Sequence, residues 1–187
     1  MNPKNLGNKF ERECSRILSL WITNNERDDV IYRNINSGAQ ATFRKRYQGK
    51  ETIQDGDFIT TVLEYEWLLN CFFIDSKNYK EFNPFIINEK NIKSNLIFQQ
   101  YIKVVNDCPV HKVPIVICNI RDRKTPQFVL VPSYFKFGFH EHSFITYSFG
   151  ENSLGKNYDC VCVLLDSFVK NENAKELVEF NKKEKKV

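Results

Sequence analysis

The first segment of the chain with a clear hydrophobic pattern is typical of a helix. Apolar residues recur there three or four positions apart and form one face of a helix over residues 8–24: Phe10, Cys14, Ile17, Leu18 and Trp21. Gly7 and Asn8 suit the start of this helix, and Asn24 and Asn25 suit its end. We therefore predict an amphipathic first helix that buries one face.

Short apolar runs rich in β-branched and aromatic residues predict the strands. They cover residues 30–32, 57–62, 71–75, 113–120, 127–131, 143–149 and 160–165. Residues 64–69 fit a strand extension and a short helix equally well. The stretch 34–54 is polar and longer than an ordinary connection, which favours a loop with a binding role.

Two more helices complete the pattern. Residues 89–105 carry apolar side chains at helical spacing, and a polar helix is expected over 166–182. Neither an internal repeat nor a Gly/Ser/Pro-rich linker divides the 187 residues. The order of elements predicts an α/β fold with a mixed central sheet, in a single domain.

Composition and charge narrow the class of protein. Hydrophobic residues make up 42% of the chain and aromatic residues 14%, which excludes the composition of a disordered protein. The formal charge of +4 permits binding to nucleic acid without requiring it. The basic residues form three clusters: Arg44, Lys45, Arg46 and Lys50; Lys77, Lys80, Lys90 and Lys93; and a terminal group at 182–186 that we interpret as a solvated tail.

The cysteines and the start of the chain indicate an intracellular protein. The six cysteines contain no Cys-x-x-Cys pair and lie mostly in apolar segments, which predicts reduced, buried thiols. The first residues are charged where a secretory signal would be apolar, and no run approaches the ~20 apolar residues of a membrane span. We therefore expect a cytoplasmic location and no membrane contact. A P-loop, a Gly-x-Ser-x-Gly motif and a second ligand pair for zinc beside Cys108 and His111 are all absent.

A carboxylate and an ammonium stand two residues apart at the end of an apolar run. In a strand, Asp75 and Lys77 project from the same face. The simpler alternative is that the strand ends at Ile74 and leaves a solvated pair, because burying charge is costly. Asp57 opens the preceding predicted strand, so a second carboxylate precedes the pair along the chain.

The order of these residues resembles the PD-(D/E)XK nuclease superfamily, and within it the archaeal-type Holliday junction resolvases and their phage relatives. The resemblance covers residues 7–80 and rests on Gly7, Phe10-Glu11-Arg12-Glu13, Arg33, Ser37-Gly38, Gly56-Asp57-Phe58 and Asp75-Ser76-Lys77. Two positions depart from the pattern without loss of a carboxylate: Gly56 replaces a proline, and Asp75 replaces a glutamate. The long loop before Asp57 and the residues after 125 leave the substrate less defined than the chemistry.

The resemblance implies a restriction-endonuclease-like αβββαβ core over about residues 7–132, with C-terminal additions over 133–187. It implies catalytic roles for Glu11, Asp57, Asp75 and Lys77, and metal contacts from Asp57, Asp75, Glu11 and the carbonyl of Ser76. The implied cofactor is Mg²⁺, with Mn²⁺ able to substitute, because hard cations favour oxygen ligands and can activate water. The implied partners are DNA, branched DNA in particular, and a second copy in a homodimer for recombination or repair.

Several of these assignments have rivals within the chain. Glu13 competes with Glu11 as the helix glutamate, and Asp55 competes with Asp57 as the first aspartate. The DNA contacts expected from Ser37, Arg44, Lys45, Arg46 and Lys80 compete with a plain turn and a solvated charge run. Two other functions stay open: a restriction- or repair-type duplex nuclease of the same superfamily, and an inactive DNA-binding module.

Overall fold

The computed structural model describes residues 3–34, 56–79, 96–120, 126–138, 144–148 and 158–182. Within these ranges the protein is a mixed α/β fold with a five-stranded mixed sheet, a two-stranded sheet and five α-helices. No described helix is both long and apolar enough to cross a membrane. None of the six cysteines forms a disulfide, and all but the half-buried Cys108 are buried, as the sequence predicts.

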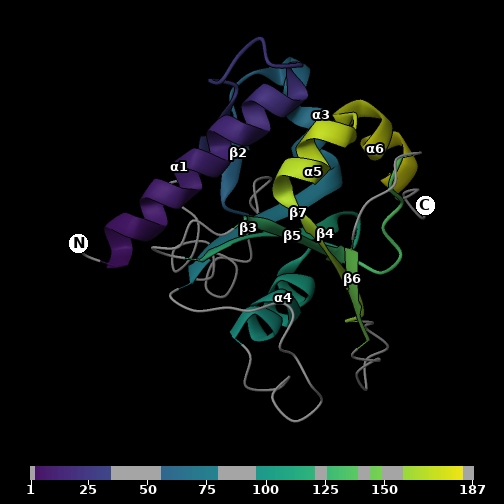
Figure 1. The fold of residues 1–187 in the computed structure, drawn as a ribbon. Helices are drawn as coiled ribbons and strands as arrows, with labels where there is room; N and C mark the ends of the chain where they lie inside the picture. The colour runs from purple at the N-terminus through teal and green to yellow at the C-terminus, as the bar shows by residue number, and fades with distance from the viewer. Residues whose placement is uncertain are drawn as a thin grey trace, which may run out of the picture.

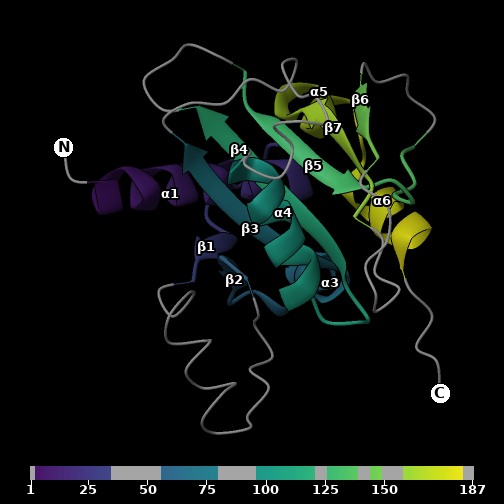
Figure 2. The same ribbon diagram turned by 90° about the horizontal axis from the view of Figure 1, so that it is seen from below.

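The larger sheet has the strand order β3-β4-β5-β7-β6. Strands β3 (Phe72–Tyr79) and β4 (Val113–Ile120) are parallel over eight residue pairs. The other neighbours are antiparallel: β5 (Phe128–Pro132), β7 (Cys160–Leu164) and β6 (Phe144–Tyr147). Parallel neighbours need a crossover, and α4 (Leu96–Asp107) lies within it (Figure 2). Because β3 is the first strand in this order, it forms one edge of the sheet.

Helices cover both faces of this sheet. Helix α4 lies on one face, and the other helices lie on the opposite one (Figure 1). Successive side chains of β3 enter two different cores, because Phe72 and Ile74 pack on the side of α1 while Phe73 packs on the side of α4. Burial on both faces accounts for the nearly continuous apolar run that the sequence shows there.

Helix α1 spans Pro3–Ile22, so it begins five residues before the predicted start and includes Gly7. Phe10, Cys14 and Leu18 on its predicted apolar face are buried. The end is confirmed by backbone conformation, since Asn24 and Asn25 both have positive φ (53° and 67°). Asparagine tolerates this conformation better than most residues, which suits it to the end of a helix.

The predicted strand over residues 57–62, which Asp57 opens, was expected in the central sheet, and this prediction is wrong. The short strand β2 (Phe58–Thr60) pairs with β1 (Ile31–Arg33) in the separate two-stranded sheet. The ambiguous segment before β3 is helical, with a 3-10 turn, η1 (Leu63–Tyr65), followed by α3 (Glu66–Cys71). This helical segment separates β2 from β3 along the chain, and β2 pairs with β1.

The prediction of a single polar C-terminal helix is also wrong. Two helices are present, α5 (Leu165–Asn171) and α6 (Ala174–Asn181), and the Asn173 side chain caps α6 by accepting from the amides of Lys175 and Glu176. Each helix buries an apolar face in the core beneath α1. The remaining predicted strands are confirmed, and the largest change is at β3, which ends at Tyr79 and not at residue 75. The predicted start of the second helix at 89–95 and the loop from 35 lie outside the described residues.

Candidate active site

The candidate site lies at the outer edge of β3, where residues 56 and 57 meet the strand. The Asp57 amide donates to the Ile74 carbonyl at 3.1 Å. Gly56 has a φ of 136°, and a Cβ at this position would lie 3.0 Å from the Ile74 oxygen. Only glycine adopts this conformation readily and permits this approach, so Gly56 allows the chain to bring Asp57 against β3.

Two aspartates share one backbone amide at this edge. The Ser76 amide donates to Asp57 Oδ2 and to Asp75 Oδ1, each at 2.9 Å, and the Ser76 hydroxyl donates to Asp57 Oδ2 at 3.3 Å. Both carboxylate oxygens therefore lie within hydrogen-bond distance of the same nitrogen, which places the two carboxylates side by side. Asp57 and Asp75 are each only 8% exposed. The structure brings together two carboxylates that are 18 residues apart in the sequence.

Lys77 supplies the opposite charge. Its Nζ lies 2.6 Å from Asp75 Oδ1 and 3.6 Å from Asp57 Oδ2. Strand β3 continues to Tyr79, so the interpretation of Asp75 and Lys77 as a solvated pair beyond the strand is wrong. Burial lowers the pKa of Lys77, but the charges of Asp75, Asp57 and Glu11 and the hydrogen bond to Asp75 raise it to a net value above the ordinary one. Lys77 is therefore an ammonium.

Asp75 is held where its charge is disfavoured. Burial is the largest cause, followed by a hydrogen bond with Asp57 and the negative charge of Asp57, and together they raise the pKa of Asp75 to about 7. The charge of Lys77 and its hydrogen bond oppose this rise. Among the described residues, Lys77 is the cation in contact with both carboxylates, and its charge does not offset burial and the negative charge of Asp57.

Gln100 is a member of the site that sequence reasoning missed. From α4 it donates through Nε2 to Asp75 Oδ2 at 2.6 Å. It stands four residues before Val104, which is buried against the sheet, so helical spacing places Gln100 on the buried face but does not indicate its partner. The contact with Asp75 could not be predicted from the sequence, because it depends on where α4 crosses β3.

Glu11 is paired with Arg33, another residue on which the resemblance rests. Its carboxylate accepts a charge-assisted hydrogen bond from Nε of Arg33 on β1. Glu11 lies near enough to contribute to the raised pKa of Lys77, but no direct contact with Asp57 or Asp75 is seen. Glu13 instead accepts from Gln127 at an exposed position, which favours Glu11 over Glu13 as the member of this site.

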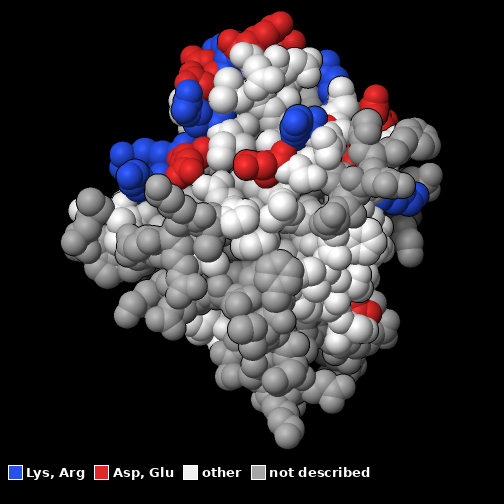
Figure 3. Space-filling view, viewed as in Figure 1, with Lys and Arg blue, Asp and Glu red and all other residues white. Residues whose placement is uncertain are grey.

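The remaining predicted site residues lie outside the described part of the chain. They are Ser37, Arg44, Lys45, Arg46 and Lys80, together with Asp55, the rival of Asp57. On the face shown in Figure 3, basic and acidic side chains alternate over the described elements. The described part of that face therefore has no continuous basic surface, and the predicted DNA contacts stay predictions.

The donor set can be compared with what a metal requires. Among the described residues, no three His, Cys, Asp or Glu side chains are grouped closely enough to hold an ion. Two carboxylates are close together, and Mg²⁺ is commonly held by one or two carboxylates with waters and substrate phosphate. The raised pKa of Asp75 also fits a site for a divalent cation, which would stabilise the ionised carboxylate. The pair thus fits Mg²⁺ better than a fully protein-ligated structural ion.

Comparison of the chain with protein-family models, with curated proteins and with solved structures found no significant match.

Proposed function

We propose that this protein is a Mg²⁺-dependent endonuclease that hydrolyses phosphodiester bonds in DNA. The observation that supports this most directly is the pair of buried aspartates, Asp57 and Asp75, joined at the Ser76 amide beside Lys77. Two carboxylates and one ammonium at a strand edge suit a reaction that needs a metal-bound water and stabilisation of a phosphate charge.

The order of elements supports the same proposal. From α1 to β4 the helices and strands run α1-β1-β2-β3-α4-β4, with the helical segment η1–α3 inserted before β3. This is the order of the αβββαβ core of restriction-endonuclease-like nucleases that the motifs imply. The separate β1-β2 sheet is a departure from one continuous sheet, so the finer fold assignment belongs to the proposal.

Each residue has a distinct task in the proposed reaction. Asp57 and Asp75 hold the metal, which supplies an activated water and neutralises charge on the phosphate. Gln100 orients Asp75 through its 2.6 Å hydrogen bond. Lys77 is an ammonium and therefore stabilises developing negative charge, since it has no free lone pair to accept a proton. The carbonyl of Ser76 is proposed as a further metal contact.

The loss of folding stability caused by the aspartate pair argues against an inactive binding module. Asp75 has a raised pKa, so its ionised form destabilises the fold at neutral pH. A protein that only bound DNA would gain by replacing Asp75 with a neutral residue. The pair thus favours an enzyme over a binding module.

The substrate preference rests on the resemblance alone. We propose branched DNA such as a four-way junction, cut by a homodimer, because two symmetric cuts require two sites. A restriction- or repair-type duplex nuclease is the alternative. Cleavage of a four-way junction, a flap, a duplex and a single strand, each with Mg²⁺, Mn²⁺ or chelator, tests both. No metal-dependent cleavage of any of these would refute the nuclease proposal.

Two substitutions test the assigned residues. Asp57→Asn removes one charge with almost no change of shape, so it should lower the cleavage rate about 10²-fold or more while DNA binding survives. Lys77→Ala should lose cleavage to a similar degree but keep Mn²⁺ binding, because an ammonium does not ligate a cation. The control is Asp28→Asn, which removes an exposed carboxylate paired with Arg16 and should cleave at the wild-type rate. Near-wild-type cleavage by either site variant would show that the site is assigned wrongly.

A further inference from the structure

The Glu11–Arg33 ion pair lies near Asp57 and Asp75 but is in contact with neither of them. Its side chains are 17% and 24% exposed, so both are half-buried and still reachable from solvent. The contact uses Nε of Arg33, one of the donors with which a guanidinium also binds phosphate oxygens. Glu11 is thereby occupied by an arginine, and no group of three acidic side chains is assembled among the described residues.

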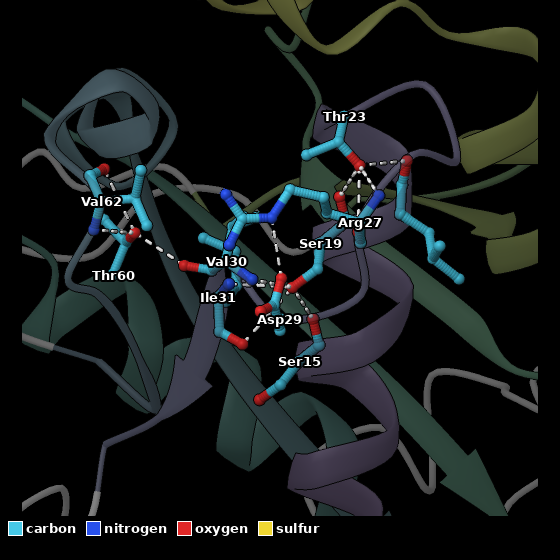
Figure 4. Close-up of polar contacts among 10 residues, drawn as sticks. Ser15, Ser19, Thr23, Arg27, Asp29, Val30, Ile31, Thr60 and Val62 are labelled. Atoms are coloured by element: carbon cyan, nitrogen blue, oxygen red, sulfur yellow. Dashed lines mark hydrogen bonds and ion pairs between the residues drawn. The ribbon is translucent and has the colours of Figure 1, made fainter.

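The backbones that carry this pair are held in place by buried hydroxyls (Figure 4). Ser19 Oγ on α1 accepts from the amides of Val30 and Ile31 at 3.2 Å and 2.8 Å. Thr60 Oγ1 on β2 donates to the Val30 carbonyl at 2.7 Å. These contacts join α1, β1 and β2, so Glu11 and Arg33 are carried by elements that are fixed to each other.

Separation of the two side chains therefore needs rotation about their own bonds and no movement of the fold. Arg33 pairs with Phe58 in the β1-β2 sheet, so it stands directly beside the segment that carries Asp57. Both side chains keep some exposed surface, so a phosphate from solvent can reach Arg33 and replace the carboxylate with another anion, which leaves the guanidinium paired. The planar guanidinium of Arg33 can bind the oxygens of a phosphodiester as well as those of a carboxylate.

We propose that Arg33 is a phosphate-binding residue of this site, and that a DNA phosphate replaces Glu11 as its partner. The exchange frees the Glu11 carboxylate to join Asp57 and Asp75. The site then has its third carboxylate only when DNA is present. This inference rests on the proposed nuclease function, but it concerns binding steps that can be measured without cleavage.

The first test measures binding of a duplex oligonucleotide by fluorescence anisotropy in chelator, so that no metal takes part. Glu11→Gln should bind about two- to fivefold more tightly than Glu13→Gln, because only the former frees Arg33. Glu13→Gln is the matched control, since it removes an equal charge from the same helix at an exposed position. Arg33→Gln should lower the salt slope of binding by about 0.9, as expected for one lost phosphate contact.

The double variant tests whether the tighter DNA binding of Glu11→Gln depends on Arg33. When Arg33→Gln is already present, adding Glu11→Gln should give no more tightening than Glu13→Gln does, because no guanidinium is left to free. Equal tightening by Glu11→Gln and Glu13→Gln in the wild-type background would overturn the exchange and indicate simple charge repulsion. Greater tightening by Glu11→Gln than by Glu13→Gln when Arg33 is already replaced would overturn it too. An unchanged salt slope in Arg33→Gln would overturn it as well.

A second readout is Mn²⁺ binding without DNA, measured by calorimetry at about pH 8, above the pKa of Asp75. Arg33→Gln should bind Mn²⁺ several-fold more tightly than wild type, and the charge-matched Glu11→Gln, Arg33→Gln double variant should return to the wild-type value. Retained tightening in the double variant would overturn the role of Glu11. Arg16→Gln, which breaks an exposed ion pair on the same helix, should leave Mn²⁺ binding unchanged.

The outcomes separate the two proposals. The expected binding pattern without metal-dependent cleavage by wild type would retain the exchange and refute the nuclease. Cleavage by wild type without the difference between Glu11→Gln and Glu13→Gln would retain the nuclease and refute the exchange. A wild-type protein that binds no DNA would refute both.

Discussion

Asp75 concentrates the electrostatic cost of the site on one side chain. It accepts hydrogen bonds from Lys77, Gln100 and the Ser76 amide, yet its pKa is raised to about 7 by burial and by Asp57. Three donors stabilise the carboxylate, but they do not offset the loss of water and the neighbouring charge. Such an arrangement is typical of functional sites, where stability is sacrificed for reactivity.

The raised pKa predicts how stability depends on pH. Because the pKa of Asp75 is higher in the folded protein than its ordinary value of 3.8, the folded state favours the protonated form. The contribution to stability is therefore complete below about pH 4 and is lost as the pH rises through about 7. In chelator, the melting temperature of wild type should fall more between about pH 5 and pH 8 than that of Asp75→Asn.

Thermal unfolding followed by intrinsic fluorescence measures both variants under the same conditions. Added Mg²⁺ at about pH 8 should raise the melting temperature of wild type and leave that of Asp75→Asn nearly unchanged, since a ligand stabilises the state that binds it. Parallel curves for the two proteins in chelator would contradict the assignment of the titration to Asp75.

At the scale of elements, the Ser19 hydroxyl joins α1 to the two-stranded sheet, and two further hydroxyls lie four residues before and after it. Ser15, Ser19 and Thr23 each donate to a carbonyl one turn earlier in α1. Only Ser19 and Thr23 also accept from amides, and Ser19 accepts two from β1 and the residue before it. This contact decides where β1 lies, and with it the position of Arg33.

The two serines should therefore differ in their effect on stability. Ser19→Ala should lower the free energy of unfolding by about 1–3 kcal/mol, because buried amides lose their acceptor. Ser15→Ala is the matched control and should cost much less, because its hydroxyl only adds to a helix carbonyl. Urea unfolding of both variants measures the difference. Equal losses would show that Ser19 does not hold β1 on α1.

At the scale of the whole molecule, the C-terminal helices share a core with the first helix. The Trp21 indole donates to the Glu172 carbonyl at 2.7 Å, and its ring centroid lies 5.3 Å from that of Phe168. Leu177 on α6 has no exposed surface. The residues expected as additions beyond the core thus pack directly against the helix that carries Glu11.

This packing predicts that the C-terminal helices unfold together with the rest. Leu177→Ala should lower the free energy of unfolding by about 2–5 kcal/mol, as for other buried leucines. It should do so in one transition, because the helix and the sheet share a core. Glu179→Ala on the exposed side of α6 is the control and should change stability by less than about 0.5 kcal/mol. A separate early transition confined to loss of helix would contradict the shared core.

What the sequence determined by itself follows from local periodicity. The buried face of α1 and the limits of β4 could be predicted, because side-chain burial repeats with the period of each element. The same-face placement of Asp75 and Lys77 also followed from the period of a strand. The break between α5 and α6 was missed, since their apolar faces become visible only against the core that they cover.

The assembly of the site was decided by tertiary structure. Asp57 reaches Ser76 because β3 is an edge strand whose free amide takes a carboxylate as partner. The contacts of Gln100 with Asp75 and of Arg33 with Glu11 join residues 25 and 22 positions apart, and their spacing carries no periodic signal. Local pattern reports which face of an element is buried, whereas these contacts depend on how separate elements cross, which only the packed chain fixes.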